Sequence, residues 1–188
     1  AVAGIFAYTT NYSTSTKGAA TIDGNPPEAE STASPNPSKA DWEAFATTLI
    51  PLAHHAISGT VAGNDVLGTR DNPEITVITN NVTLTGNADG AGILIITAGT
   101  RIHTTGTFHY EGLVIIMTDG ADDGMLQLDH TGTGRFFGSI ISLGDYVNYK
   151  PHGKPEVKYS SAALDNLSKM DAFTLKPDLL TWREIKPG

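Results

Sequence analysis

The strongest pattern along the chain is a repeat of short apolar runs, each placed behind a pair of glycines, between residues 82 and 141. In three segments a Thr-Gly pair is followed six residues later by a second glycine and then by an apolar run. The step is 20 residues from the first segment to the second and 26 to the third. The glycine pairs are Gly86 with Gly92, Gly106 with Gly112, and Gly132 with Gly138.

This period predicts the fold class. A unit of 20 residues is too short for a pair of helices and is typical of one coil of a β-solenoid. The runs Ile93–Ile96 and Leu113–Ile116 are rich in β-branched residues, as expected for strands that neighbours bury. We therefore expect a mainly all-β fold, a parallel β-solenoid or β-helix of coils of about 20 residues, with glycines at the corners. An antiparallel β-sandwich is the alternative.

The rest of the chain divides into four parts within one structural domain. Residues 1–37 are predicted as an N-terminal extended segment with a Pro-rich linker, and residues 58–161 as the solenoid core. Within the first part, residues 1–8 are apolar enough for a strand, and residues 19–27 resemble half a coil. The other two parts are a helix over 38–57 and a short helix with a tail over 162–188.

The helix over 38–57 has the clearest local signals. Ser38 is a good N-cap, and Asp41 suits the positive end of the helix. Trp42, Phe45 and Leu49 continue into Leu52 and Ala53 as one apolar stripe, which has to pack against another surface. We expect this helix to cap or flank the solenoid, since an open end would present unpaired strand edges. Pro51 is expected to kink or split it.

Composition narrows the classes of function. Twenty acidic against twelve basic residues give a net charge of −8, which argues against a broad nucleic-acid-binding surface. The chain has no cysteine, so disulfides, thiolate metal sites and cysteine nucleophiles are absent. No apolar run is long enough to span a membrane, and the chain does not begin with Met. We expect a processed product or a fragment from which any leader or membrane helix is missing.

Few residues are arranged for chemistry. The six extra residues of the longer step fall in the acidic segment 118–124, where carboxylates among glycines could hold Ca²⁺ or form a solvated loop. No catalytic elbow, phosphate-binding loop or convergent carboxylate set is present, so we expect a non-enzyme without a cofactor other than this calcium. The weak calcium candidates are Asp119, Asp122 and Asp123.

The histidines do not form a metal column. The repeat places His103 level with Thr83 and Asp129, and His130 level with Leu84 and Thr104. His54 and His55 are adjacent, which is not the i, i+4 spacing of a ligand pair on a helix. Ordinary hydrogen-bonded or exposed histidines are the simpler interpretation.

The order of the segments resembles the C-terminal region of PilX-like type IV pilus assembly proteins. The resemblance rests on the Gly-Ala-Gly-Ile-Leu-Ile-Ile, Phe-His-Tyr-Glu-Gly-Leu-Val-Ile-Ile and Gly-Ser-Ile-Ile segments, then Val-Lys-Tyr-Ser at 157–160 and Thr-Trp-Arg-Glu at 181–184. It covers about residues 75–185. The resemblance implies a minor pilin-like protein: an exported domain that follows a membrane helix, which this chain lacks.

These observations favour a non-catalytic structural or adhesive component of a pilus or related surface filament. Its expected partners are pilin or other pilus-assembly subunits, and a surface ligand is a further candidate. Tyr146, Tyr149 and His152 lie in a polar segment and are candidate contact residues, or simply part of a surface loop. The alternatives are a bactofilin-like polymer-forming scaffold and a carbohydrate-active enzyme on a β-helix.

Overall fold

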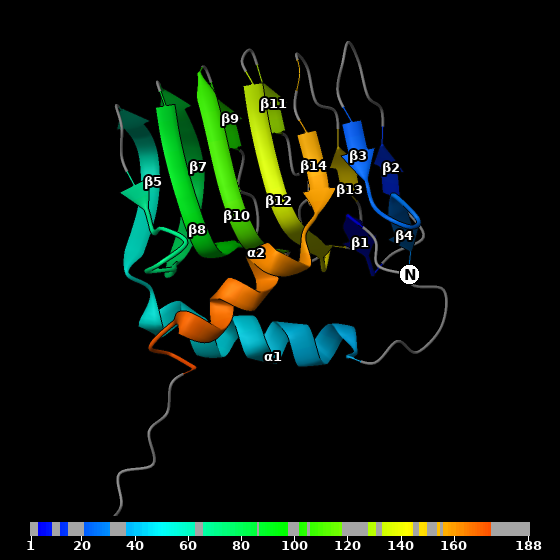
Figure 1. Cartoon of the computed structure of the whole chain (residues 1–188), viewed down its shortest axis with the longest axis horizontal. Coiled ribbons are helices and arrows are strands. Elements are labelled where there is room, and N and C mark those ends of the chain that lie inside the picture. The colour runs from blue at the N-terminus through cyan, green and yellow to red at the C-terminus, as the bar shows by residue number, and fades with distance from the viewer. Residues whose placement is uncertain are drawn as a thin grey trace, which may run out of the picture.

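Parallel strands make up most of the computed structural model. Twelve strands form one sheet, and β2 and β13 form a parallel pair beside it (Figure 1). The structure describes residues 4–8, 12–14, 21–30, 37–62, 66–85, 87–97, 102–104, 106–117, 128–130, 133–144, 147–149, 154 and 156–173.

The strands and helices have the following bounds. The strands of the first half are β1 Ile5–Ala7, β2 Tyr12–Thr14, β3 Thr21–Asp23, β4 Glu28–Glu30, β5 His55–Ala62, β6 Val66–Leu67, β7 Glu74–Thr85 and β8 Asn87–Ile96. Those of the second half are β9 Ile102–Thr104, β10 Thr107–Ile116, β11 Leu128–His130, β12 Thr133–Ser142, β13 Val147–Tyr149 and β14 Glu156–Tyr159. The helical segments are α1 Lys39–Leu49, η1 Ile50–Leu52, α2 Ser161–Asp165 and η2 Asn166–Lys169.

The register of the strands reproduces the sequence repeat. Gly112 of β10 lies beside Gly92 of β8 and Gly138 of β12, and both pairings continue in register over ten residues. Leu128 of β11 pairs with Ile102 of β9, so the longer step enters between Ile116 and Leu128. The prediction that the three segments stack side by side is therefore confirmed.

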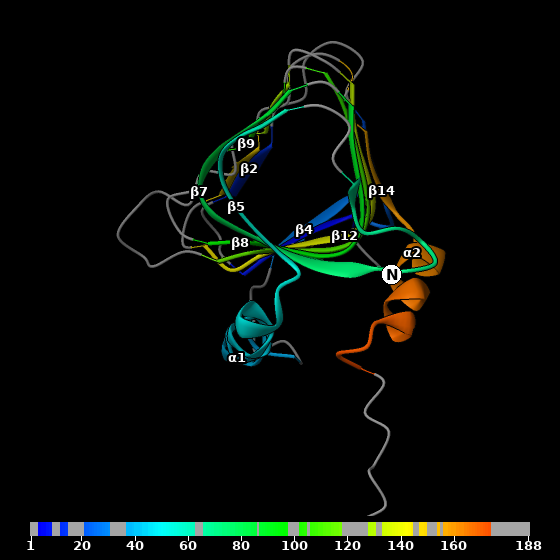
Figure 2. The ribbon, with the colours of Figure 1, turned by 90° about the vertical axis from the view of Figure 1, so that its left-hand side faces the viewer.

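Successive passes of the chain lie on one another as layers, which we number from the β5 end. In Figure 2 the strands of successive layers lie behind one another along three sides. We call these the helix side, which lies above α1; the cleft side, which lies next to α2; and the far side, which contains β9 and β2. The layers are 1 (residues 55–67), 2 (74–91), 3 (92–111), 4 (112–137), 5 (138–159), 6 (5–23) and 7 (28–30).

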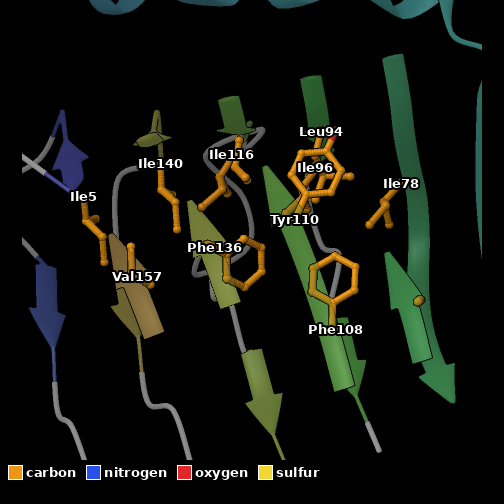
Figure 3. Packing of buried hydrophobic residues seen from close by; sticks show 12 residues of the cluster. Ile5, Ile78, Leu94, Ile96, Phe108, Tyr110, Ile116, Phe136, Ile140 and Val157 are labelled. Carbon is orange, nitrogen blue, oxygen red and sulfur yellow. The ribbon is translucent and has the colours of Figure 1, made fainter. Parts of the chain in front are cut away.

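The continuous apolar runs are explained by burial on both faces of the helix side. Side chains alternate along a strand, so Ile93 and Ile95 point outward, toward the helices, while Leu94 and Ile96 point into the interior. The interior cluster also contains Phe108, Tyr110 and Phe136 of the cleft side and Ile5 of layer 6 (Figure 3). Each apolar residue of such a run is therefore buried, as the sequence predicted.

Helix α1 flanks the stack instead of capping its end. It runs beneath the helix side, along several layers (Figures 1 and 2). Ala46 and Leu49 are buried in the outer cluster, with Trp42 and Phe45 packed against it. Ser38 is the N-cap, as predicted, and it forms a capping box with Asp41. The physical reason for this position is that the outward side chains of the helix side are apolar and need cover.

The helix is shorter than predicted. The α-helix ends at Leu49, Pro51 lies in the following 3₁₀ turn, and β5 begins at His55. Leu52, expected in the apolar stripe, is 50% exposed. In the N-terminal part, β1 lies in the segment 1–8 that was predicted as a possible strand, and β3 lies in the segment 19–27 that was predicted as half a coil. Together with β2 and β4 these strands form layers 6 and 7.

Candidate functional site

The outward face of the cleft side carries mostly polar side chains in register. Side chains alternate between the two faces of a strand, and neighbouring strands pair in register. Equivalent outward positions therefore form columns that cross the layers. On the same strands Phe108, Tyr110 and Phe136 point inward and are buried. The first outward column consists of Asp89, His109, Arg135 and Glu156; the second consists of Ala91, Glu111, Phe137, Lys158 and Asp23.

Glu111 is the most buried charged side chain of these columns. It is 7% exposed, and the Nε and Nη2 atoms of Arg70 donate hydrogen bonds to its two carboxylate oxygens. These hydrogen bonds from Arg70 lower the pKa of Glu111 against the opposing effect of burial. His109 Nε2 lies 3.1 Å from Glu111 Oε1, in ion-pair range but without hydrogen-bond alignment. The carboxylate is thus held ionised and oriented.

Lys158 links two neighbouring layers. Its Nζ lies 2.5 Å from a carboxylate oxygen of Glu156 in the same strand and 3.8 Å from Asp23 Oδ2 in layer 6. The hydrogen bond to Glu156 raises the pKa of Lys158. The Lys158 side chain is 43% exposed and lines the cleft beside Tyr159, so water screens both contacts.

Helix α2 forms the second wall of a cleft over this surface. Ser160 caps the helix by accepting a hydrogen bond from the N–H of Ala163 at 3.2 Å. Lys169 donates to the carbonyl of Arg70 at 3.0 Å and so ties the end of η2 to the loop before β7. The cleft has a volume of about 380 Å³ and is lined by Arg70, Glu111, Phe137, Lys158, Tyr159, Ser160, Ala162, Ala163 and Asn166.

The cleft continues toward layer 6. A neighbouring hollow of about 360 Å³ shares Lys158 and Tyr159 with it and adds Asp23, Gly24 and Asn25. Ring faces, amide and hydroxyl groups and both signs of charge are therefore available along one surface. Such a mixture suits an extended polar ligand that offers hydrogen-bond donors and acceptors together with some apolar area.

None of the candidate residues chosen from the sequence is among the described residues that line this cleft. Asp119, Asp122 and Asp123 lie outside the described residues, as do Tyr146 and His152. Tyr149 is in β13, but its side chain is outside the description. Within the described ranges, no group of three or more His, Asp and Glu residues is placed to hold a metal ion.

The histidines are arranged as the repeat predicted. His103 pairs with Thr83 and Asp129, so it does not stack on His130. His54 accepts a hydrogen bond from the N–H of Ile75 at its Nδ1, at 3.1 Å, and His55 Nε2 lies 2.6 Å from Glu74. Neither residue is on a helix, because the helical segment ends before them.

Sequence reasoning missed the cleft for two different reasons. The columns could have been found, because the repeat already aligned Asp89 with His109 and Arg135. Arg70 could not, because it precedes the repeat and reaches Glu111 across 41 residues of chain. The wall formed by α2 depends in the same way on docking between distant segments.

Comparisons with known proteins give no further identification: no family model, no curated protein and no solved structure matches this chain. In the described part of the chain, no helix has both the length and the apolar character to cross a membrane.

Proposed function

We propose that this protein is a non-catalytic structural and adhesive component of an exported surface filament, a type IV pilus or a related assembly, built on a β-solenoid. The support for a solenoid is the register of the strands: steps of 20 and 26 residues bring an equivalent glycine to the same corner in successive layers. The similarity of the repeats and the Val-Lys-Tyr-Ser and Thr-Trp-Arg-Glu segments to PilX-like proteins supports the pilus assignment.

A rigid body suits this role. The strands of the helix side are covered on one face by the interior cluster and on the other face by the cluster that includes α1. They therefore cannot separate without exposing two apolar clusters. Forces along a filament would act on strands that are paired in register over ten residues. The observation that carries the proposal is therefore the long in-register stack, with a polar cleft open on one side.

The cleft supports binding better than catalysis. Among the described residues that line the hollow of about 380 Å³, Glu111 is the one carboxylate, and Asp23 lies in the neighbouring hollow. Arg70 holds Glu111 with a lowered pKa, so Glu111 is a poor general acid near neutral pH. Glycoside hydrolysis by the common mechanisms needs two carboxyl groups with distinct protonation states. We therefore favour a contact surface for a polar ligand over the carbohydrate-active alternative.

A bactofilin-like scaffold would require copies to stack end to end. The edge strands of layer 1 argue against such stacking at this end. Strand β6 has two residues, and β5 has a register irregularity between Ile57 and Gly59. Short and irregular edge strands hinder pairing with another chain.

The first experiment locates the protein in its native cell. A tagged copy is followed after surface filaments are sheared off, with the filament and cell fractions blotted separately. We expect signal in the filament fraction that disappears when pilus assembly is blocked. Signal confined to the cell body would overturn the filament assignment and favour an internal scaffold.

A pair of variants tests the adhesive role of the cleft. Phe137→Ala removes an aromatic side chain from the cleft lining, whereas Phe173→Ala removes a 41% exposed one that stacks on Phe45 away from it. We expect the first variant to weaken attachment of filament-bearing cells and the second to leave it unchanged. If both variants attach equally at equal filament yield, the cleft does not contribute to adhesion.

A further inference from the structure

The charges along the cleft compensate one another. Arg70 donates hydrogen bonds to both carboxylate oxygens of Glu111. Lys158 lies between the carboxylates of Glu156 and Asp23. Among the described residues that line the two hollows, two are basic and two are acidic. A ligand with a net charge of either sign would therefore meet like charges as well as opposite ones, whereas an uncharged ligand meets no such repulsion.

The cleft still offers hydrogen-bonding atoms to a ligand. Arg70 gives two N–H groups to Glu111, and a guanidinium has five. In the described part of the chain, neither the hydroxyl group of Tyr159 nor the side-chain amide of Asn166 has a protein partner. Because the ion pair already orients Arg70 and Glu111, a ligand does not have to order them on binding. The cleft is thus prepared for a ligand with both donors and acceptors.

Two aromatic side chains add an apolar contact to these polar groups. Phe137 lies between Glu111 and Lys158 in the second column, and Tyr159 follows Lys158 in β14. Both line the hollow of about 380 Å³, and Tyr159 also lines the neighbouring one of about 360 Å³. The face of an aromatic ring is electron-rich and attracts C–H groups that neighbouring oxygens have made slightly positive. A sugar ring combines such C–H groups on its faces with hydroxyl groups at its rim.

An extended peptide would need a different kind of surface. A peptide that binds as an added strand uses unpaired backbone groups at the edge of a sheet. Glu111, Phe137 and Lys158, which form the floor of the cleft, are each paired with a neighbouring strand on both sides. The floor therefore offers side chains and no strand edge, which favours a saccharide over a peptide strand.

We propose that the cleft binds an uncharged oligosaccharide, with Phe137 packed against a sugar ring and with Tyr159 and Asn166 hydrogen-bonded to hydroxyl groups. The two hollows share Lys158 and Tyr159, so a chain of sugar units can pass from one hollow to the other. This proposal rests on the contact role of the cleft proposed above and names the chemical class of the ligand. It does not depend on the pilus assignment, because the described residues of the cleft all belong to one chain.

The test begins with the purified full-length protein on an array of ligands. The array holds neutral oligosaccharides of hexoses and N-acetylhexosamines, acidic counterparts that contain sialic or uronic acids, and extended peptides. We expect binding to a neutral member. Its affinity in a calorimetric titration should change less than about twofold between low and high salt, because salt screens only charges. Binding confined to acidic members or to peptides, or no binding to any neutral member, would overturn the proposal.

Variants then place the sugar in the cleft. Phe137→Ala should weaken binding of the neutral oligosaccharide about tenfold. Tyr159→Phe, which removes only a hydroxyl group and leaves the ring, should weaken it several-fold. Phe173→Ala is the matched control and should bind as the parent protein does, because Phe173 is 41% exposed and stacks on Phe45.

The unfolding midpoint of each variant shows whether it is folded. If Phe137→Ala does not fold, Tyr159→Phe decides the question. Folded cleft variants that bind as tightly as the control would overturn the proposal.

The result is distinguishable from that of the filament experiment. A protein that is found in filaments but binds no neutral oligosaccharide keeps the filament assignment and loses this class of ligand. A protein that binds a neutral oligosaccharide through the cleft but is absent from filaments keeps the ligand class and loses the pilus assignment.

Discussion

At the scale of single residues, a column of glycines bends the strands from the cleft side to the helix side. Gly92, Gly112 and Gly138 have φ values of +133°, +138° and +136°, which side chains rarely tolerate. A Cβ at Gly112 would lie 2.0 Å from the carbonyl oxygen of Gly92. Each glycine is therefore required twice, by its own backbone and by the layer against which it packs.

Replacing Gly112 should destabilise the protein more than its φ value alone predicts. A positive φ costs a residue with a side chain about 1–2 kcal/mol, and in Gly112→Ala the clash with Gly92 adds to this cost. Gly59→Ala is the matched control, since Gly59 has a φ of +86° but no atom of the described residues within 4 Å of the place where a Cβ would lie. Urea unfolding should show a larger loss for Gly112→Ala; equal losses would contradict the steric role.

The pairing of Arg70 with Glu111 makes stability depend on pH. The pKa of Glu111 lies below its ordinary value of 4.5 in the folded protein, chiefly because Arg70 donates hydrogen bonds to it. A depressed folded pKa stabilises the protein above the unfolded pKa, and the contribution is lost as pH falls through the folded value. The contribution is therefore full at neutral pH and fades below about pH 5.

Glu111→Gln should remove this part of the acid sensitivity. We expect the free energy of unfolding to fall less steeply below about pH 5 in the variant than in the parent protein. Arg70→Gln should flatten the same part of the profile, because it removes the main cause of the lowered pKa. Urea midpoints measured from pH 7 to 3 check this, and a flattened profile in Glu111→Gln alone would show that Arg70 is not the cause.

At the scale of elements, each layer consists of strands joined by connections of variable length. Layers 3 and 4 keep one register although the chain needs 20 residues for one step and 26 for the next. The connection between Thr97 and Ile102 has four residues, and that between Met117 and Leu128 has ten. The strands, and not the connection, therefore determine where the next layer begins.

Deleting residues 119–124 should leave the stack intact. The deletion shortens the longer connection to four residues and restores the 20-residue step. We expect a change in unfolding free energy within about 1 kcal/mol, as the cost of loop closure varies slowly with length. Deletion of His109 alone is the control, because a one-residue slip reverses every later side chain of β10 and should prevent folding. A large loss in the first deletion would contradict the modular picture.

The same deletion tests calcium. It removes Asp119, Asp122 and Asp123 together, so any Ca²⁺ binding that depends on them should disappear in a calorimetric titration. Ca²⁺ binding that persists after the deletion would show that the ion binds to other residues.

At the scale of the whole molecule, the start of the chain closes the stack that its later residues build. Ile5 joins the interior cluster with Ile140 and Val157, and α1 then returns beneath the helix side to the first layer (Figure 1). The two ends of the described chain are thus tied into one body by contacts between segments far apart in sequence.

Removing residues 1–30 should destabilise the protein and cause self-association. Loss of the buried Ile5 side chain alone corresponds to about 1.5–3 kcal/mol, and the uncovered edge of layer 5 can pair with other copies. Ile5→Ala is the control: it should lower the unfolding midpoint without association, because the strands remain in place. Size-exclusion chromatography with light scattering measures this, and a monomeric truncated protein would contradict the covering role of layer 6.

The sequence by itself determined the repeating part of the fold. The spacing of Gly92, Gly112 and Gly138 predicted their register, and the continuous apolar runs predicted burial on both faces. Both inferences succeed because in-register parallel strands place equivalent residues side by side, so a structural regularity appears directly as a period in the sequence.

Only the tertiary structure decided how the non-repeating segments dock. The apolar stripe of α1 predicted that the helix caps or flanks the stack, but it did not decide between these two positions. Residues 1–8 and 19–27 were predicted as a possible strand and half a coil, but not as a layer that stacks on layer 5. The meeting of Arg70 with Glu111 depends on the fold alone. The physical reason is that strand alternation and helical periodicity are local properties, whereas docking depends on which surfaces the other segments leave uncovered.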